Sequence, residues 1–133
     1  VARILAATPR IHCMRDATRG GLGGILAEIA AQCGLEIVID ENRIPVRDGV
    51  RGMCEILGLD PLFLANEGRA AVFCPAGDAD QVLAAMRGHE QGREAGVIGG
   101  VDRKSRGRLV LNTSIGGSRE VDLPTGELVP RIC

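Results

Sequence analysis

The sequence contains no tryptophan and no tyrosine, and it has only two phenylalanines, Phe63 and Phe73. A recognition surface built on large aromatic anchors is therefore not expected. Long apolar runs are also missing: none approaches the roughly 20 residues of a membrane-spanning helix, and the opening residues do not form a signal peptide. Positive charge is not in surplus, since 16 Lys and Arg stand against 17 Asp and Glu. Nucleic-acid binding needs a basic surface, so we expect neither nucleic acid nor a membrane among the partners.

Cysteine clusters of the zinc-binding type are absent as well. The five cysteines stand singly at positions 13, 33, 54, 74 and 133, no Cys-x-x-Cys occurs, and the two histidines lie far apart in the sequence. Such spacing does not favour a zinc site, and we assign no metal ligands. An odd number of cysteines without a targeting signal is typical of a reducing compartment. We therefore expect free thiols and a cytoplasmic location.

What the sequence does have is an aliphatic pattern: 45% of its 133 residues are hydrophobic, and 19 are glycine. This length is typical of one domain that buries about two-thirds of its extended-chain surface. The clearest element is an apolar stripe at helical spacing from Leu22 to Cys33, followed by Gly34, which predicts a helix over 22–33. Alternating apolar and polar residues over 35–40 predict a strand directly after it.

Helices and strands continue to alternate along the rest of the chain. Asp48 and Asp78 are the expected N-caps of two further helices. Strands are predicted over 69–74 and 97–101, and another over 108–111 as the hairpin partner of the second. The glycine- and proline-rich C-terminal stretch indicates a strand remnant followed by a mobile tail. This order predicts an α/β or α+β domain of two or three layers, with no boundary inside the chain.

A glycine-rich segment over 14–24 precedes the strongest helix and carries four glycines among polar residues. Helix N-termini present unpaired N–H groups and the positive end of the helix dipole, so an anion such as phosphate can bind there. Gly20 and Gly21 allow a ligand to approach the backbone, and Arg15 and Arg19 supply positive charge. The segment is therefore a candidate phosphate site, although neither a Walker loop nor a dinucleotide fingerprint is present.

A second candidate is the sequence Asn66-Glu67-Gly68, which lies between two apolar runs, 61–65 and 69–74. A carboxylate between apolar runs can be partly desolvated, which raises its pKa towards a value useful for a general base. This interpretation makes Glu67 a candidate catalytic residue.

Both segments also have a purely structural interpretation. In the first, Asp16 or Thr18 caps the helix and the glycines permit close packing of helix against strand. In the second, Asn66-Glu67-Gly68 is an ordinary turn in which Gly68 has a positive φ and Glu67 is solvated. The local sequence leaves these alternatives open.

The chain ends in a cysteine, Cys133, which is an unsuitable core residue because the adjacent α-carboxylate resists burial. That carboxylate also raises the pKa of the thiol, and Arg131 partly offsets it. The ten residues over 124–133 span about 33 Å if extended, which is enough to carry a chemical group between two sites. The alternative is a frayed end with an accidental cysteine.

Three motifs together are similar to one family. HxMRDATRGGLGG at 12–24, LGLDPLFLANEGR at 57–69 and the terminal PRIC at 130–133 resemble the C-terminal domain of the HypE family of hydrogenase-maturation proteins. That family belongs to the aminoimidazole ribonucleotide synthetase-like superfamily of ATP-using enzymes. The resemblance covers essentially the whole chain and implies an α+β domain in which a mixed sheet packs with helices. The first two motifs are shared across the superfamily, whereas the PRIC ending is specific to the member.

The resemblance implies an ATP-dependent carbamoyl dehydratase. In this family a partner carbamoyltransferase loads the terminal cysteine, here Cys133, and the S-carboxamide is dehydrated to a thiocyanate. The cyanide then passes to iron on a scaffold complex, for the metal site of [NiFe]-hydrogenase. Glu67 is the candidate base, and Pro130 and Arg131 position the tail. The residues expected on the phosphate side of the nucleotide are Asp16, Thr18, Arg19, Gly20 and Gly21.

The expected domain organisation is a superfamily domain over 1–123 followed by a flexible tail over 124–133 that ends in the carrier cysteine. The ATP- and Mg²⁺-binding half of the family is not found in these residues, and the first residue is Val rather than Met, so we expect a fragment that binds no cofactor and is inactive alone. The full-length protein is expected to be a homodimer. An alternative function is the corresponding domain of another ATP-dependent small-molecule synthetase or kinase, with no covalent role for Cys133.

Overall fold

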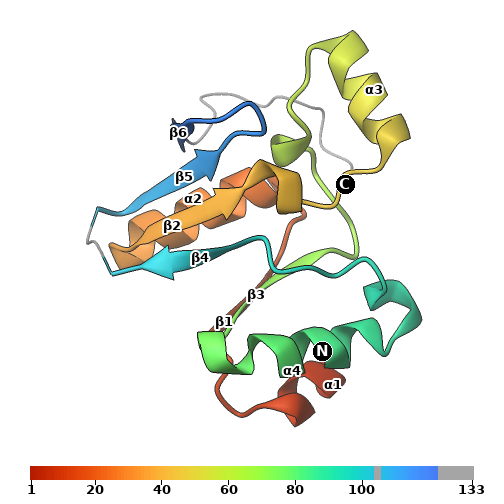
Figure 1. The fold of residues 1–133 in the computed structure, drawn as a ribbon, viewed down its shortest axis with the longest axis vertical. Coiled ribbons are helices and arrows are strands. Elements are labelled where there is room, and N and C mark those ends of the chain that lie inside the picture. The colour runs from red at the N-terminus through yellow and green to blue at the C-terminus, as the bar shows by residue number, and fades with distance from the viewer. Residues whose placement is uncertain (104–105, 123–133) are drawn as a thin grey trace.

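The computed structural model describes residues 1–103 and 106–122 of the chain. No helix within these ranges is both long and apolar enough to span a membrane. In chain order the helices and strands, drawn in Figure 1, are α1 (Ala2–Ala7), β1 (Cys13–Asp16), α2 (Gly21–Cys33), β2 (Glu36–Asp40), α3 (Asp48–Leu57), β3 (Ala70–Phe73), α4 (Ala79–Arg87), β4 (Gly99–Asp102), β5 (Arg108–Asn112) and β6 (Ser118–Val121).

The elements form a mixed four-stranded sheet and a separate two-stranded ladder. The sheet has the order β4-β2-β5-β6, in which β5 is parallel to β2 and the other neighbours are antiparallel. Helix α2 packs on one face of this sheet (Figure 1). The ladder pairs β1 with β3, and α1 packs against α4 beside it. The predicted α+β architecture with a mixed sheet is confirmed.

The core lies between α2 and the sheet. The predicted helix and the strand after it are confirmed, and Gly34 ends α2 in the left-handed conformation at φ 66°. Burial of each large aliphatic side chain contributes about 1.5–3 kcal/mol, so this layer supplies most of the hydrophobic stabilisation. Its buried members are Ala17, Ile25, Leu26, Ala27, Ala30, Ile37, Ile39, Leu62, Leu109, Leu111 and Val121.

The predicted hairpin between 97–101 and 108–111 is wrong. Strands β4 and β5 do not pair with each other, because both pair with β2, from opposite sides. Parallel pairing of β5 with β2 puts Leu109 beside Ile37, on the face that α2 covers. An ion pair at 2.5 Å between Arg108 and the buried Glu36 holds the same register. Periodicity identifies strands, whereas burial against α2 selects their partners.

One predicted helix cap is wrong and the other is right in position only. Asp48 is the first residue of α3, and Arg47 occupies the cap position. Asp78 occupies the N-cap position of α4, but its side chain makes no capping bond: its buried carboxylate accepts hydrogen bonds from Thr8 Oγ1, at 2.6 Å, and from the Arg10 guanidinium. The N-terminal segment is thereby tied to the start of α4. The sequence patterns predict neither α1 nor β1, whose places depend on this long-range contact and on the pairing with β3.

This network makes a prediction about pH. Hydrogen bonds from Thr8 and then Arg10 lower the pKa of Asp78 below its ordinary value near 3.8. Because the pKa is depressed in the folded state, the stabilisation is present above the unfolded pKa and is lost as pH falls through the folded pKa. Asp78→Asn should therefore lower the melting temperature at pH 7, and the difference from wild type should shrink below pH ~4.

Thermal unfolding followed by circular dichroism at pH 7 and pH 3 measures this effect. Asp80→Asn is the control, since Asp80 is an exposed carboxylate two residues later, in the first turn of α4. An equal loss of melting temperature at both pH values would contradict the role of the charge.

Candidate functional site

The structure brings the two motif segments, 14–24 and 66–69, side by side. The backbone N–H of Ala17 donates to the carbonyl of Arg69, and the N–H of Asn66 donates to the carbonyl of Ala17, both at 3.0 Å. The β1–β3 ladder continues this contact, with Asp16 opposite Ala70. Residues about fifty positions apart in sequence therefore form one surface at the end of the ladder, beside the start of α2.

Glu67 stands on a turn at this surface. Gly68 has φ +75°, and Glu67 is exposed. The amide Nδ2 of Asn66 donates to the carbonyl of Leu64 at 2.7 Å, which holds the turn. The expected shielding of Glu67 between apolar runs is not provided by the described residues, so the turn geometry follows the structural alternative. The catalytic role of Glu67 stays a prediction, and it requires cover from outside these residues.

The start of α2 is open on the same surface. Gly20, exposed and at φ +68°, occupies the N-cap position, and no side chain caps the helix. The hydroxyl of Thr18 donates instead to Asp16 at 3.3 Å, so the alternative in which Asp16 or Thr18 caps α2 is wrong. Arg19 is exposed and forms no hydrogen bond or ion pair with any described residue. Uncapped N–H groups and a free guanidinium are the groups that an anion would use.

The next glycines serve packing. Gly21 is buried at φ +63°, and a Cβ there would lie 2.6 Å from the carbonyl oxygen of Leu64. A Cβ on Gly23 would lie 2.9 Å from the side chains of Leu62 and Phe63. The helix can therefore begin directly against the turn 61–64, which leads into Asn66. The structural alternative correctly assigned these glycines to close packing, but the contact is with a turn rather than a strand.

Gly21→Ala should destabilise the fold by at least about 2 kcal/mol, because the left-handed backbone alone costs a residue with a Cβ about 1–2 kcal/mol and the backbone clash adds to it. Gly52→Ala is the matched control. Gly52 lies within α3 with nothing near its Cβ position, and alanine there should stabilise by up to about 1 kcal/mol. Denaturant unfolding measures both, and similar effects of the two changes would contradict the packing role.

The sequence of this domain matches the model of a known family. The model described as "AIR synthase related protein, C-terminal domain" matches residues 1–112. The chain belongs to this family. The prediction of superfamily and fold from the motifs is confirmed.

Curated relatives of this AIR synthase related domain share one name. The chain is 53% identical over 133 residues to "Carbamoyl dehydratase HypE" of Azotobacter vinelandii, covering 100% of this chain and 39% of that protein. It is 51% identical to the protein of the same name from Cupriavidus necator, covering 100% of this chain and 38% of that protein. The chain therefore spans about two fifths of the length of the curated relatives it matches. The predicted resemblance to HypE is confirmed.

Solved structures agree with the fold. A crystal structure of E. coli HypE matches with a TM-score of 0.90 and 42% identity, over 99% of this chain and 40% of that one. A HypE structure in complex with ATP matches with a TM-score of 0.87 and 41% identity, over 93% and 38%. A HypE-HypF complex matches with a TM-score of 0.85 and 38% identity, over 92% and 39%.

Three predicted site residues of this AIR synthase related domain, Pro130, Arg131 and Cys133, lie outside the described residues, as does the predicted boundary at 123–124. Their roles stay predictions. The other four cysteines are free thiols. Burial, and then the charge of Asp78, raise the pKa of Cys74, so that thiol is protonated at neutral pH.

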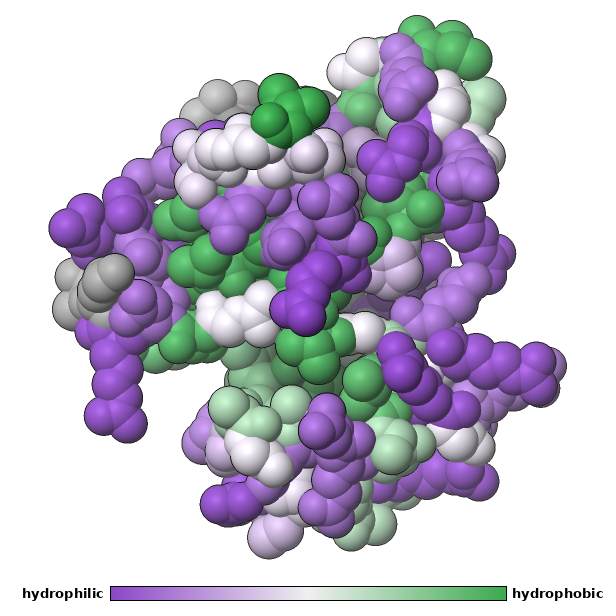
Figure 2. Space-filling view, in the orientation of Figure 1, coloured by the Kyte–Doolittle hydropathy of each residue, from purple (hydrophilic) through white to green (hydrophobic). Residues whose placement is uncertain are grey.

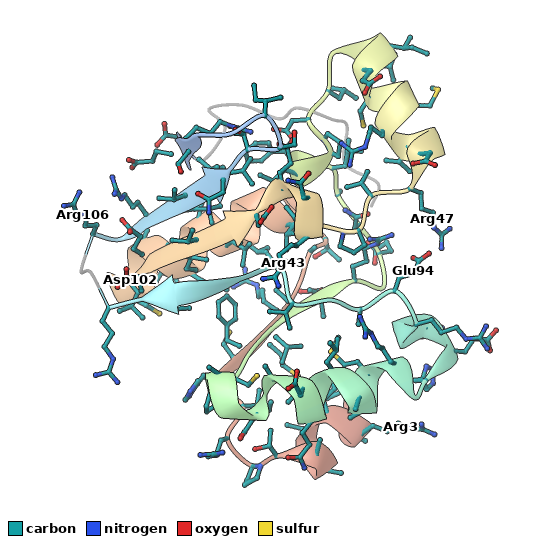
Figure 3. All side chains as sticks on the ribbon, in the orientation of Figure 1. Arg3, Arg43, Arg47, Glu94, Asp102 and Arg106 are labelled. Carbon is teal, nitrogen blue, oxygen red and sulfur yellow. The ribbon has the colours of Figure 1, made fainter. Side chains whose placement is uncertain are left out.

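Within residues 1–103 and 106–122, no group of three or more His, Cys, Asp or Glu could hold a metal ion. A shallow depression of about 690 Å³ is lined mainly by residues of β2 and β4, and none of the predicted site residues lines it. Figure 3 shows two of its lining residues, Asp102 at the end of β4 and Arg43 near the start of that strand. No local sequence pattern marks this depression, since its residues come from separate strands.

Proposed function

We propose that the chain is the C-terminal domain of a HypE-type carbamoyl dehydratase of [NiFe]-hydrogenase maturation, with residues 1–123 as the domain and 124–133 as a carrier segment. One observation carries the proposal: the similarity to a protein named carbamoyl dehydratase, at 53% identity, extends over all 133 residues and so reaches the terminal Cys133. The activity is proposed for the whole protein, because the chain covers 39% of that relative.

The reaction proposed is the loss of water from an S-carboxamide on Cys133. The carboxamide oxygen is phosphorylated at the expense of ATP, which makes it a leaving group. Two N–H protons are then removed, the C–O bond breaks, phosphate departs, and the C≡N bond of the thiocyanate is complete. ATP supplies the driving force, and the protein must supply a base, a phosphate cradle and a dry environment.

The described residues offer two of these three. Glu67, on the turn tied to Ala17, is the proposed base. Thr18, Arg19 and Gly20 have accessible groups on the same surface and are the proposed phosphate contacts, with Asp16 beside them. Gly21 is buried by packing, so only its backbone N–H is available for such a role.

The third requirement, a site closed to water, is not met by the described residues. Glu67, Arg19 and Gly20 are all exposed, and an activated carboxamide open to water would hydrolyse. We therefore propose that the preceding half of the protein covers this surface and holds ATP and Mg²⁺, and that the present chain is inactive alone. The crystal structure of a HypE with ATP supports nucleotide binding in the family.

The proposed partners follow from the same chemistry. A carbamoyltransferase must load Cys133, and a HypE-HypF complex supports such an assembly. An iron-carrying scaffold complex must accept the cyanide, and the full-length protein is proposed to be a homodimer. A cytoplasmic location is supported by the free thiols Cys13, Cys33, Cys54 and Cys74.

The test is mass spectrometry of the C-terminal peptide of the whole protein in two stages. During incubation with the carbamoyltransferase, carbamoyl phosphate and ATP, the early samples should show the mass gain of one carboxamide. Later samples should show the same peptide lighter by one water. An unmodified peptide would favour the other candidate, a domain of a small-molecule synthetase or kinase.

A further inference from the structure

Helix α3 presents an apolar surface that the described residues do not cover. Val50, Met53 and Leu57 lie on one side of the helix and are 42%, 56% and 60% exposed; we call them the α3 face. Ile56 beside them is 79% exposed. Only Cys54 of this helix is buried, and its main packing partner is the short turn Pro61–Phe63. Figure 1 shows α3 at the extremity of the molecule opposite α1 and α4, and Figure 2 shows apolar surface over it.

The last described strand is joined to the C-terminal end of α3 by an ion pair. Strand β6 ends at Val121, and the guanidinium of Arg119 on β6 pairs with Asp60 at 2.9 Å. Asp60 follows the last residue of α3 by three positions. The ion pair therefore ties the strand from which the C-terminal segment leaves to the C-terminal end of α3.

The remaining eleven residues, 123–133, have the length and composition to reach and cover the α3 face. Eleven residues span at most about 36 Å, whereas the ten residues of α3 span about 15 Å. The segment carries apolar side chains at Leu128, Val129 and Ile132. It also carries both Glu127 and Arg131, which complement the exposed Arg51 and Glu55 on α3.

We propose that residues 123–133 dock on the α3 face through Leu128, Val129 and Ile132. Three or four side chains on a ten-residue helix offer much less surface than the roughly 1,200 Å² that a stable complex of separate proteins buries. A tethered segment needs less area, since its effective concentration near the face is in the millimolar range. The small size of the face therefore favours a segment of the same chain over a second copy or another protein.

Docking holds the segment that carries Cys133 on the α3 face rather than on the Glu67 surface. The inference goes beyond the proposed activity and is independent of it, because it concerns where the segment binds and not what the thiol carries. Release from α3 is then a separate step before any chemistry at the Glu67 surface.

Disulfide trapping in the whole protein tests the docking. Met53→Cys and Leu57→Cys place a thiol on the α3 face. Ile115→Cys is the matched control, because Ile115 is 95% exposed and lies seven residues before Asp122, within reach of the same segment. Mild oxidation should link Cys133 to at least one α3 position about tenfold faster than to position 115, within a single chain. Equal rates at all three positions, or links only between two chains, would overturn the proposal; the second result would assign the face to a second copy.

A second measurement needs no introduced thiol. Met53→Glu should raise the rate at which a maleimide modifies Cys133, read on the C-terminal peptide, to the rate seen in Leu128→Ser, while Ile115→Glu should leave it unchanged. If Met53→Glu alters the circular dichroism spectrum, Met53→Ser replaces it. An unchanged modification rate together with lost binding of the carbamoyltransferase would assign the face to that partner and overturn the docking. Trapping without any carbamoyl adduct on wild type would overturn the proposed function alone.

Discussion

Cys133→Ser in the whole protein should abolish the carbamoyl adduct. A serine hydroxyl keeps the size of the side chain but is a far weaker nucleophile than a thiolate at neutral pH. The expected result is complete loss of the mass gain on the C-terminal peptide after incubation with carbamoyltransferase, carbamoyl phosphate and ATP. Every later step depends on this covalent attachment, so the overall activity should fall to background.

Cys33→Ser is the control for Cys133→Ser, since Cys33 is an exposed thiol at the end of α2. That variant should gain the adduct at the wild-type rate. An adduct that persists in Cys133→Ser and maps to another residue would show that the terminal cysteine is not the carrier. Deleting residues 131–133 should have the same effect as Cys133→Ser, and full activity after the deletion would favour the alternative function.

Glu67→Gln should leave carbamoylation intact and slow dehydration by about 10²-fold or more, the usual scale for a lost general base. Glutamine keeps the shape of the side chain but does not accept a proton. The change should also be harmless to the fold, because Glu67 is exposed and the turn is held by Asn66 and Gly68. A single-turnover measurement on the purified carbamoylated protein isolates this step.

Glu90→Gln is the matched control for Glu67→Gln, since Glu90 is also an exposed carboxylate in a short loop. It should dehydrate at the wild-type rate. Thiocyanate formation at the normal rate in Glu67→Gln would remove Glu67 from the mechanism. A defect already at the loading step would instead place Glu67 in the contact with the carbamoyltransferase.

The glycine-rich motif shows why one pattern supports two interpretations. Gly20 is exposed at the uncapped start of α2, where an anion has access to the backbone. Gly21 and Gly23, one and three residues later, are buried against the turn 61–64. One glycine of the motif therefore leaves the start of α2 open, and the others let the helix pack against the turn that leads to Glu67.

Some local elements of this protein, α2 and β2 above all, were decided by sequence alone. The apolar stripe of α2, its end at Gly34 and the alternation of β2 were all predictable, because hydrophobic period and glycine stops act over a few residues. The family was also identifiable from the motifs at 12–24 and 57–69, since these are local strings. The terminal PRIC at 130–133, also a local string, was enough to make Cys133 the candidate carrier.

Tertiary structure alone decided which strands pair and which segments meet at the candidate site. Strand β5 joined β2 in parallel because Leu109 and Leu111 must be buried under α2 with Ile37 and Ile39, and periodicity says nothing about partners. Hydrogen bonds to Ala17 brought the Glu67 turn beside the start of α2, and the same packing left Glu67 in solvent. Long-range burial and hydrogen bonding depend on residues far apart in the chain, which is why no local pattern could show them.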